Sequence, residues 1–166
     1  TEAGFDFRGQ GQLIKQQAIG IIESAREKRD SLPQRIAKMM EIREIDPNAN
    51  RIIWHDLEAE RRSIEHAIPT VKSVFGSQDD ETKAERIIGF SDGEFQELAG
   101  KPQMLGSGCN FQRHCSWAIF LGIGFKFNDF IQAVHRIHRF LQPHRVRIDL
   151  IYTESEREVK RILEQK

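Results

Sequence analysis

The chain has 166 residues, and its 25 lysines and arginines balance 25 aspartates and glutamates, so its formal net charge is zero. This length allows one domain with its own hydrophobic core, and no apolar run approaches the roughly 18 residues that a membrane span needs. Neutrality argues against a free-standing, non-specific nucleic-acid coat protein, because such proteins are usually strongly basic. Cys109 and Cys115 are too few for a disulfide framework, which favours a reducing cytoplasm.

The charges are unevenly distributed along the chain. From Leu98 to Arg147 there are seven lysines and arginines but one acid, Asp129, so this stretch carries a net charge of +6 and the rest carries −6. Such a split is expected where one surface meets an anion, and chance clustering explains it equally well.

The first third of the chain predicts helices. Apolar residues recur at helical spacing over 12–29, and a second helix begins at the capping residue Ser31, has Pro33 in its first turn and stops at Asp46 and Pro47. We therefore interpret 1–49 as an N-terminal helical extension and 50–166 as the main domain.

From residue 50 onward, strand and helix patterns alternate. Strands are expected at 51–55, 71–75, 103–105, 117–121 and 146–152, and helices at 57–67, 80–90, 128–141 and from the capping box of Thr153 and Glu156 to 165. Parallel strands need crossover helices, so this order predicts an α/β fold with a parallel sheet covered by helices on both faces. Ligands of such sheets bind beyond the carboxyl ends of the strands, which here are the loops after His55, Leu105 and Leu121.

The helix expected at 128–141 carries the most informative pattern. At helical spacing, one face gathers polar side chains and the opposite face gathers apolar ones. Paired arginines beside a glutamine suit a triphosphate, because the guanidinium fork matches phosphate oxygens. A solvated basic face would give the same pattern. The polar face holds Gln132, His135, Arg136 and Arg139, the apolar face holds Ala133, Ile137, Phe140 and Leu141, and His138 is expected to be partly buried and hydrogen-bonded.

Two turns contain glycines that would allow an anion to approach the backbone, although plain tight turns explain them too. One is Gly76-Ser77, and the other is the segment 106–110, which reads Gly106-Ser107-Gly108-Cys109-Asn110. The sequence contains no G-x-x-x-x-G-K-[ST] phosphate loop and no D-E-x-[DH] run for Mg²⁺, so this stretch of chain is not expected to activate a nucleotide unaided. Zinc is disfavoured, because the cysteines and histidines give no four-ligand set of familiar spacing.

The Gly76-Ser77 turn, the glycine loop and the arginine-bearing helix follow one another along the chain. In this order they resemble the second motor lobe of superfamily-two helicases, in particular of Swi/Snf-type DNA translocases. The family pattern is a G-S turn, a phenylalanine, a G-x-G-x-N-[hydrophobic] loop and an N-D-x-x-Q-A-x-x-R-x-H-R helix. Here these are Gly76-Ser77, Phe90, 106–111 and 128–139, and the likeness extends over about 50–164. The chain departs from the family at five positions: Leu105 and Leu141 replace glycines, Pro102 replaces Ser or Thr, and Gly122 and Gly124 stand where an acid is frequent.

The resemblance implies a RecA-like lobe that shares ATP and Mg²⁺ with a first RecA-like lobe, which would hold most of both. Its partners would be that first lobe and DNA, with RNA left open, and the chain by itself would be inactive. Arg136 and Arg139 would be arginine fingers, Gln132, Gly106, Gly108 and Asn110 would contribute to the ATP side, and His55, Gly76, Ser77 and Ser107 would contact the nucleic-acid backbone.

Two other functions remain open. A non-enzymatic nucleic-acid-binding module could use the basic stretch alone, with steeply salt-dependent binding. An α/β enzyme of different chemistry, such as a nucleotide-sugar or methyl transferase, could use the glycine loop as a cofactor site. Against the latter, the loop lacks the G-x-G-x-x-G pattern of a dinucleotide site.

Overall fold

The computed structural model describes residues 18–105, 109–122, 127–157, 161 and 165. The chain divides into two compact units, Thr1–Pro33 and Gln34–Lys166. In the first unit residues 18–30 are helical, and the rest of the predicted helix, 12–17, lies outside the described residues. A boundary between extension and lobe after residue 49 stays a prediction.

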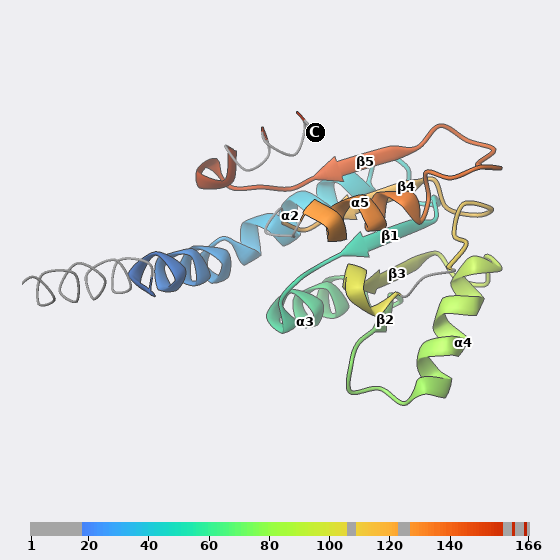
Figure 1. Cartoon of the computed structure of the whole chain (residues 1–166), viewed down its shortest axis with the longest axis horizontal. Helices are drawn as coiled ribbons and strands as arrows, with labels where there is room; N and C mark the ends of the chain where they lie inside the picture. The colour runs from blue at the N-terminus through green and yellow to red at the C-terminus, as the bar shows by residue number, and fades with distance from the viewer. Residues whose placement is uncertain (1–17, 106–108, 123–126, 158–160, 162–164, 166) are drawn as a thin grey trace, which may run out of the picture. The chain divides into compact units, whose positions relative to one another are not determined.

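The second unit is built on a parallel sheet (Figure 1). In the described residues this sheet has five strands in the order β2-β3-β1-β4-β5, and every neighbouring pair is parallel. The predicted parallel α/β architecture is confirmed. The elements are α2 (Leu32–Arg43), β1 (Arg51–Trp54), α3 (Glu58–Ala67), β2 (Lys72–Val74), α4 (Asp80–Ser91), β3 (Glu97–Gly100), the 3₁₀ helix η1 (Pro102–Met104), β4 (Trp117–Phe120), α5 (Phe127–His135), β5 (Arg147–Leu150) and the 3₁₀ helix η2 (Glu154–Glu156).

The alternation of side chains along the strands divides the core between the two faces of the sheet. On one face, Trp54 and Phe120 pack in a cluster with Phe90 of α4 and Ala133 of α5. The intervening strand residues Ile53, Ala99 and Ile119 point to the opposite face, and the buried Met39 of α2 and Ile64 of α3 lie outside that cluster. Helices therefore cover both faces, as predicted.

One strand lies elsewhere than the sequence predicts. Residues 103–105 were expected to be a strand, but Pro102–Met104 form η1, and the strand in this region is β3. A proline has no N–H for a strand ladder, and it is well tolerated at the start of a helical turn. β3 lies between β1 and β2, with Leu98 opposite Ile52 and Lys72. The missed strand thus supplies a central part of the sheet.

The helix expected at 128–141 is shorter than predicted. α5 ends at His135, and the next turn is tighter, because the Arg136 N–H bonds to the carbonyl of Ala133 at 3.2 Å. The side chain of Gln142 then donates from Nε2 to the carbonyl of Ile137 at 2.9 Å, an acceptor that a continuing helix would use itself.

The apolar face predicted for this helix is only half present. Ala133 and Ile137 are buried as expected, but Phe140 and Leu141 are 88% and 71% exposed. Leu141 also has a φ of 69°, in the left-handed region that favours glycine. The chain turns at Leu141 and carries both apolar side chains away from the core.

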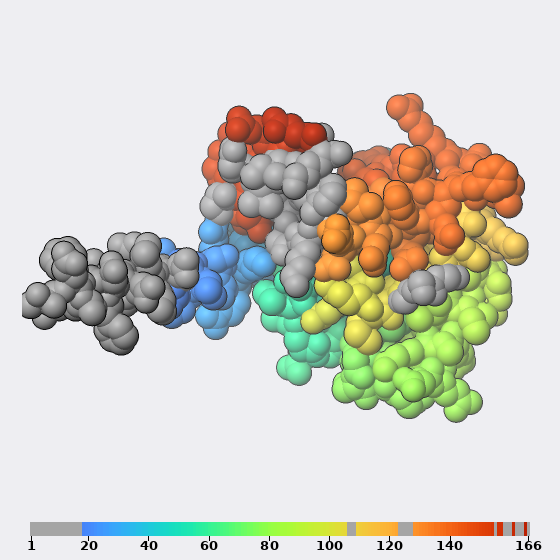
Figure 2. Space-filling view, viewed as in Figure 1, coloured from blue at the N-terminus to red at the C-terminus, as the bar shows by residue number. Residues whose placement is uncertain are grey.

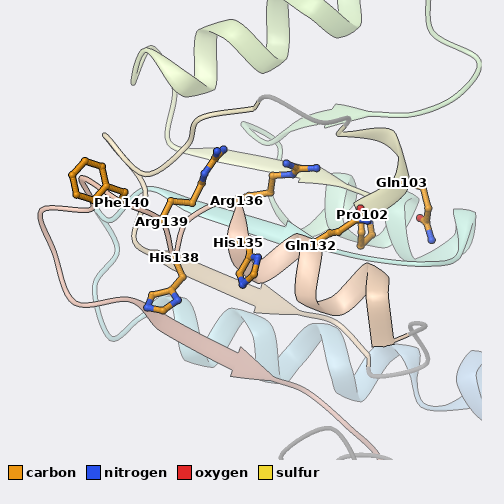
Figure 3. A pocket seen from close by; sticks show the side chains of 8 residues that line it. All are labelled: Pro102, Gln103, Gln132, His135, Arg136, His138, Arg139 and Phe140. Carbon is orange, nitrogen blue, oxygen red and sulfur yellow. The ribbon is translucent and has the colours of Figure 1, made fainter. Parts of the chain in front are cut away.

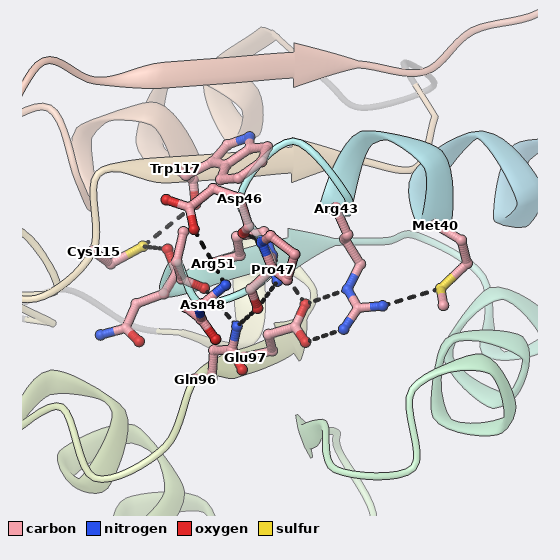
Figure 4. Close-up of polar contacts among 12 residues, drawn as sticks. Met40, Arg43, Asp46, Pro47, Asn48, Arg51, Gln96, Glu97, Cys115 and Trp117 are labelled. Atoms are coloured by element: carbon pink, nitrogen blue, oxygen red, sulfur yellow. Dashed lines mark hydrogen bonds and ion pairs between the residues drawn. The ribbon is translucent and has the colours of Figure 1, made fainter.

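The amino-terminal edge of the sheet is held by a buried charge network around Glu97 (Figure 4). Arg43, at the end of α2, donates to both carboxylate oxygens at 2.8 and 2.6 Å, and the buried Arg51 donates from Nε at 3.1 Å. The Arg51 guanidinium also lies 4.9 Å from the centroid of the Trp117 ring. These contacts join α2 to β1, β3 and β4 at the edge opposite the predicted functional loops.

The closing segment begins as the sequence predicts. The Thr153 N–H bonds to Glu156 Oε2 at 2.9 Å, which gives the expected capping box, although the turn that it starts is η2. Most of the helix predicted after it lies outside the described residues. No helix within the described part of the chain is both long and apolar enough to span a bilayer.

Candidate functional site

A cavity of about 530 Å³ lies beside α5 (Figure 3). It gathers Gln132, Arg136 and Arg139, three of the residues expected to face phosphates, although α5 ends before the two arginines. The His138 N–H still bonds to the carbonyl of Val134 at 2.9 Å, so the backbone remains close to helical and the face is kept. The complete lining is Pro102, Gln103, Gln132, His135, Arg136, His138, Arg139 and Phe140.

Arg139 is held by the loop that precedes β4. Its Nη1 donates to Asn110 Oδ1 at 2.9 Å and to the carbonyl of Cys109 at 3.2 Å. Two residues that the sequence pattern assigned to one site are therefore in direct contact. Gly106 and Gly108, expected on the ATP side, and Ser107, expected to contact the nucleic-acid backbone, lie outside the described residues.

Arg136 is half-buried, and its Nε is buried with no hydrogen-bond partner in the described structure. In Figure 3 its side chain lies on the same side of the turn as Arg139, and His138 lies on the other. Burial raises the pKa of the Cys109 thiol, and the positive charges of both arginines oppose that rise. The Arg136 and Arg139 guanidinium groups thus lie near the loop that contains Cys109, and the Nε of Arg136 has hydrogen-bonding capacity that no described residue uses.

The two histidines singled out in the sequence differ in their burial, and the expectation for His138 was wrong. His138 was expected to be partly buried, but it is exposed at the rim of the cavity. His55, expected to contact a nucleic-acid backbone, is 1% exposed, and neither ring nitrogen has a partner among the residues described. Burial, supported by Lys101 and Arg61 and opposed by Glu60, lowers the pKa of His55 to about 4. The ring is therefore neutral near pH 7 and faces the interior.

The turn after β2 is open to solvent, as a contact with nucleic acid would require. Gly76 and Ser77 are exposed, and a side chain at Gly76 would meet open space. Gln78 holds the turn, because its Oε1 accepts from the Phe75 N–H and its Nε2 donates to the carbonyl of Ser73, both at 3.0 Å. This edge of the sheet thus presents a fixed, open backbone turn to solvent.

Sequence reasoning missed a buried ion pair at the same edge. Arg35 of α2 donates from Nη1 to Glu60 Oε1 at 2.8 Å and to the carbonyl of Leu121 at 2.6 Å. The other carboxylate oxygen of Glu60 accepts from the N–H groups of Asp56 and Leu57 at 2.8 and 2.9 Å. The pair therefore joins the ends of β1 and β4. A glutamate three residues after a helix start is a recognisable capping signal, but nothing in the sequence points to Arg35.

No protein-family model and no curated protein matches the sequence. Solved structures do match. The C-terminal part of the Fun30 ATPase domain aligns with a TM-score of 0.65 and 19% identity, over 78% of this chain and 44% of that one. S. cerevisiae Dbp5 bound to RNA and ADP BeF3 aligns with a TM-score of 0.67 and 12% identity, over 81% of this chain and 36% of that one. Mss116p DEAD-box helicase domain 2 bound to an RNA duplex aligns with a TM-score of 0.63 and 15% identity, over 83% of this chain and 55% of that one.

The chain has a RecA-like α/β fold, which it shares with these helicase domains. The fold implied by the sequence resemblance is thereby confirmed. The chain spans less than half of the matched Fun30 chain. Within the residues that the structure describes, no group of three or more His, Cys, Asp or Glu side chains could hold a metal ion.

Proposed function

We propose that this RecA-like domain is the second motor lobe of an ATP-dependent helicase or translocase that moves on DNA in the cytoplasm. The observation that carries the proposal is the cavity beside α5, where Gln132, Arg136 and Arg139 meet and Arg139 bonds to Asn110. Guanidinium groups are always charged and match phosphate oxygens, so this donor set suits the γ-phosphate end of a nucleotide.

ATP and Mg²⁺ would be held mainly by a first RecA-like lobe, and this chain would complete the site. Bound Mg²⁺ neutralises charge on the phosphates. Arg139 and Arg136 would donate hydrogen bonds where negative charge develops during phosphoryl transfer, and Gln132 would help to orient the phosphates. The glycines Gly106 and Gly108 would let the loop backbone approach the nucleotide.

The proposed nucleic-acid contact uses the carboxyl edge of the sheet. The exposed turn of Gly76 and Ser77, together with Ser107, would donate hydrogen bonds to phosphates. Since His55 is 1% exposed as a whole residue, it would not touch the nucleic acid itself, and the exposed turn after β2 would make the contact. Contacts to phosphates carry no sequence information, which suits a motor that must step along any sequence.

The test is steady-state ATP hydrolysis by the chain alone and by the chain joined to a first lobe that carries a phosphate loop, with DNA or RNA added. We expect negligible turnover by the chain alone and DNA-stimulated turnover by the joined protein. Arg139→Ala should lower kcat by roughly 10³-fold or more, while ATP binding is largely kept.

Arg62→Ala is the matched control, because Arg62 is an exposed arginine of α3 that is not among the residues lining the cavity. It should leave hydrolysis unchanged. Appreciable ATPase activity of the chain alone, or normal turnover of Arg139→Ala, would contradict the motor role. Stimulation of hydrolysis by RNA but not by DNA would show that the protein moves on RNA and not on the proposed DNA.

A further inference from the structure

A second cavity, also of about 530 Å³, lies between α5 and β5. Arg139 and His138 line both cavities, so the two adjoin at these residues. The motor role described above uses the first cavity and leaves the second without a function. The second cavity is lined by Val134, His138, Arg139, Gln142, His144, Arg145, Val146 and Ile148.

The chain around this cavity is basic. Between Val134 and Ile148 the sequence contains four arginines and three histidines and no acid. Arg147 is engaged by the carboxylate of Asp149, at 2.8 Å from Nε, whereas His144 and Arg145 project into solvent. Positive charge thus continues beyond the arginines that the nucleotide would use.

An exposed aromatic ring adjoins this basic rim. Phe140 is 88% exposed and is next in the chain to Arg139 (Figure 3). Its position is set by a built turn, because Leu141 has a left-handed backbone and Gln142 donates to the carbonyls of Cys115 and Ile137, both at 2.9 Å. The ring is therefore presented to solvent by a fixed backbone.

We propose that the surface formed by Phe140, His144 and Arg145 binds single-stranded nucleic acid, with the Phe140 ring stacking on a base and Arg145 and His144 contacting phosphates. An exposed ring can stack only on a base whose face is not covered by the neighbouring bases, which selects single strands over duplex. Charge complementarity alone would also suit an acidic peptide, but a ring that stands out from the surface favours a flat base as its partner.

This surface is separate from the proposed nucleic-acid contact at Gly76 and Ser77. Residues 140–145 lead into β5 and so lie towards the amino-terminal edge of the parallel sheet, whereas Gly76 and Ser77 follow β2 and so lie at the carboxyl edge. The segment that leads into β5 is orange to red-orange in Figures 1 and 2, at the side where the arrow of β5 begins. The proposal therefore goes beyond the motor role and does not depend on it.

The test measures fluorescence anisotropy of labelled (dT)20 and (rU)20 titrated with the 166-residue chain at several salt concentrations. Phe140→Leu, which keeps an apolar side chain but no ring, should weaken binding about 5-fold or more, and Phe140→Tyr should restore it. Arg145→Ala should weaken binding and make the slope of log K against log salt shallower by about 0.7. Ile88→Ala, at another exposed apolar residue, on α4, should change nothing.

Competition separates the alternatives. Duplex DNA and polyglutamate should displace the single strand poorly, and Mg-ATP should not displace it. No measurable binding, equal affinity of Phe140→Leu and wild type, or efficient displacement by polyglutamate would overturn the proposal. Displacement by Mg-ATP would assign Phe140 to the nucleotide cavity instead. None of these results bears on the loss of hydrolysis in Arg139→Ala, so the two proposals fail separately.

Discussion

Arg139 and Asn110 are hydrogen-bonded, from Nη1 to Oδ1 at 2.9 Å, although 29 residues separate them in the chain. The contact joins the turn after α5 to the loop before β4. With the carbonyl of Cys109 as a second acceptor at 3.2 Å, the guanidinium is oriented before any ligand arrives. A group placed in advance loses less conformational entropy when it acts, which is the main advantage of a preorganised site.

Asn110→Ala should therefore reduce ATP turnover without removing the arginine. In the protein joined to a first lobe, we expect kcat to fall by about 10-fold, because supporting residues of this kind are typically worth 10- to 100-fold, while KM for ATP changes little. Steady-state kinetics measure both. Asn48→Ala, at an exposed asparagine of the α2–β1 loop, is the control. Equal kcat in the two variants would show that Asn110 does not position Arg139.

The Arg35–Glu60 pair should be a large contributor to stability. Both side chains are about 5% exposed, so removing one charge leaves the other buried and uncompensated. Arg35→Met should lower the free energy of unfolding in urea by about 3 kcal/mol, and Arg35→Met with Glu60→Gln should cost less than the sum of the single changes. Lys38→Ala breaks the exposed pair with Glu41 and should cost at most about 0.5 kcal/mol. Similar losses at Arg35 and Lys38 would refute the argument.

The strands with strong apolar runs could be predicted from the sequence. Ile52-Ile53-Trp54 and Ala118-Ile119-Phe120 are buried throughout, and burial on both faces is what a central parallel strand requires. β3 could not be predicted, because Glu97 and Gly100 weaken its pattern. Glu97 is acceptable in the core only because it binds Arg51 and Arg43, which are 46 and 54 residues away.

The candidate site was predictable in its residues but not in its shape. Spacing on an ideal helix grouped Gln132, Arg136 and Arg139, and the structure lines one cavity with them. The same spacing put Phe140 in the core, because sequence periodicity does not register that Gln142 takes the Ile137 carbonyl and ends the helical path. Gln142 is itself held by a bond to the carbonyl of Cys115, 27 residues away, and the periodicity of the sequence does not reveal such a contact.

His55 should make stability depend on pH. Its pKa is lowered from 6.5 to about 4 because the buried ring resists charging. Below pH 6.5 the unfolded chain binds a proton that the folded chain does not, so the free energy of unfolding should fall as the pH drops from 6.5 to about 4, by about 3 kcal/mol in all. Urea unfolding at a series of pH values measures this.

His55→Phe should flatten the pH dependence of the free energy of unfolding between pH 6.5 and about 4, whereas His66→Gln, at an exposed histidine of α3, should not. An unchanged slope in His55→Phe would exclude His55 as the source.

Leu141→Gly should stabilise the protein. Leu141 has a φ of 69°, which costs a side-chain-bearing residue about 1–2 kcal/mol, and its side chain is exposed, so little packing is lost. Glycine adopts this conformation freely but loses more entropy on folding, so the net gain in the free energy of unfolding should be about 0.5–1 kcal/mol. Leu141→Val should lower it, because β-branched residues tolerate positive φ poorly. Ile88→Gly, at an exposed apolar position with helical backbone, should cost about 1 kcal/mol. A loss in Leu141→Gly that matches Ile88→Gly would mean that the leucine side chain, and not the backbone, governs this turn.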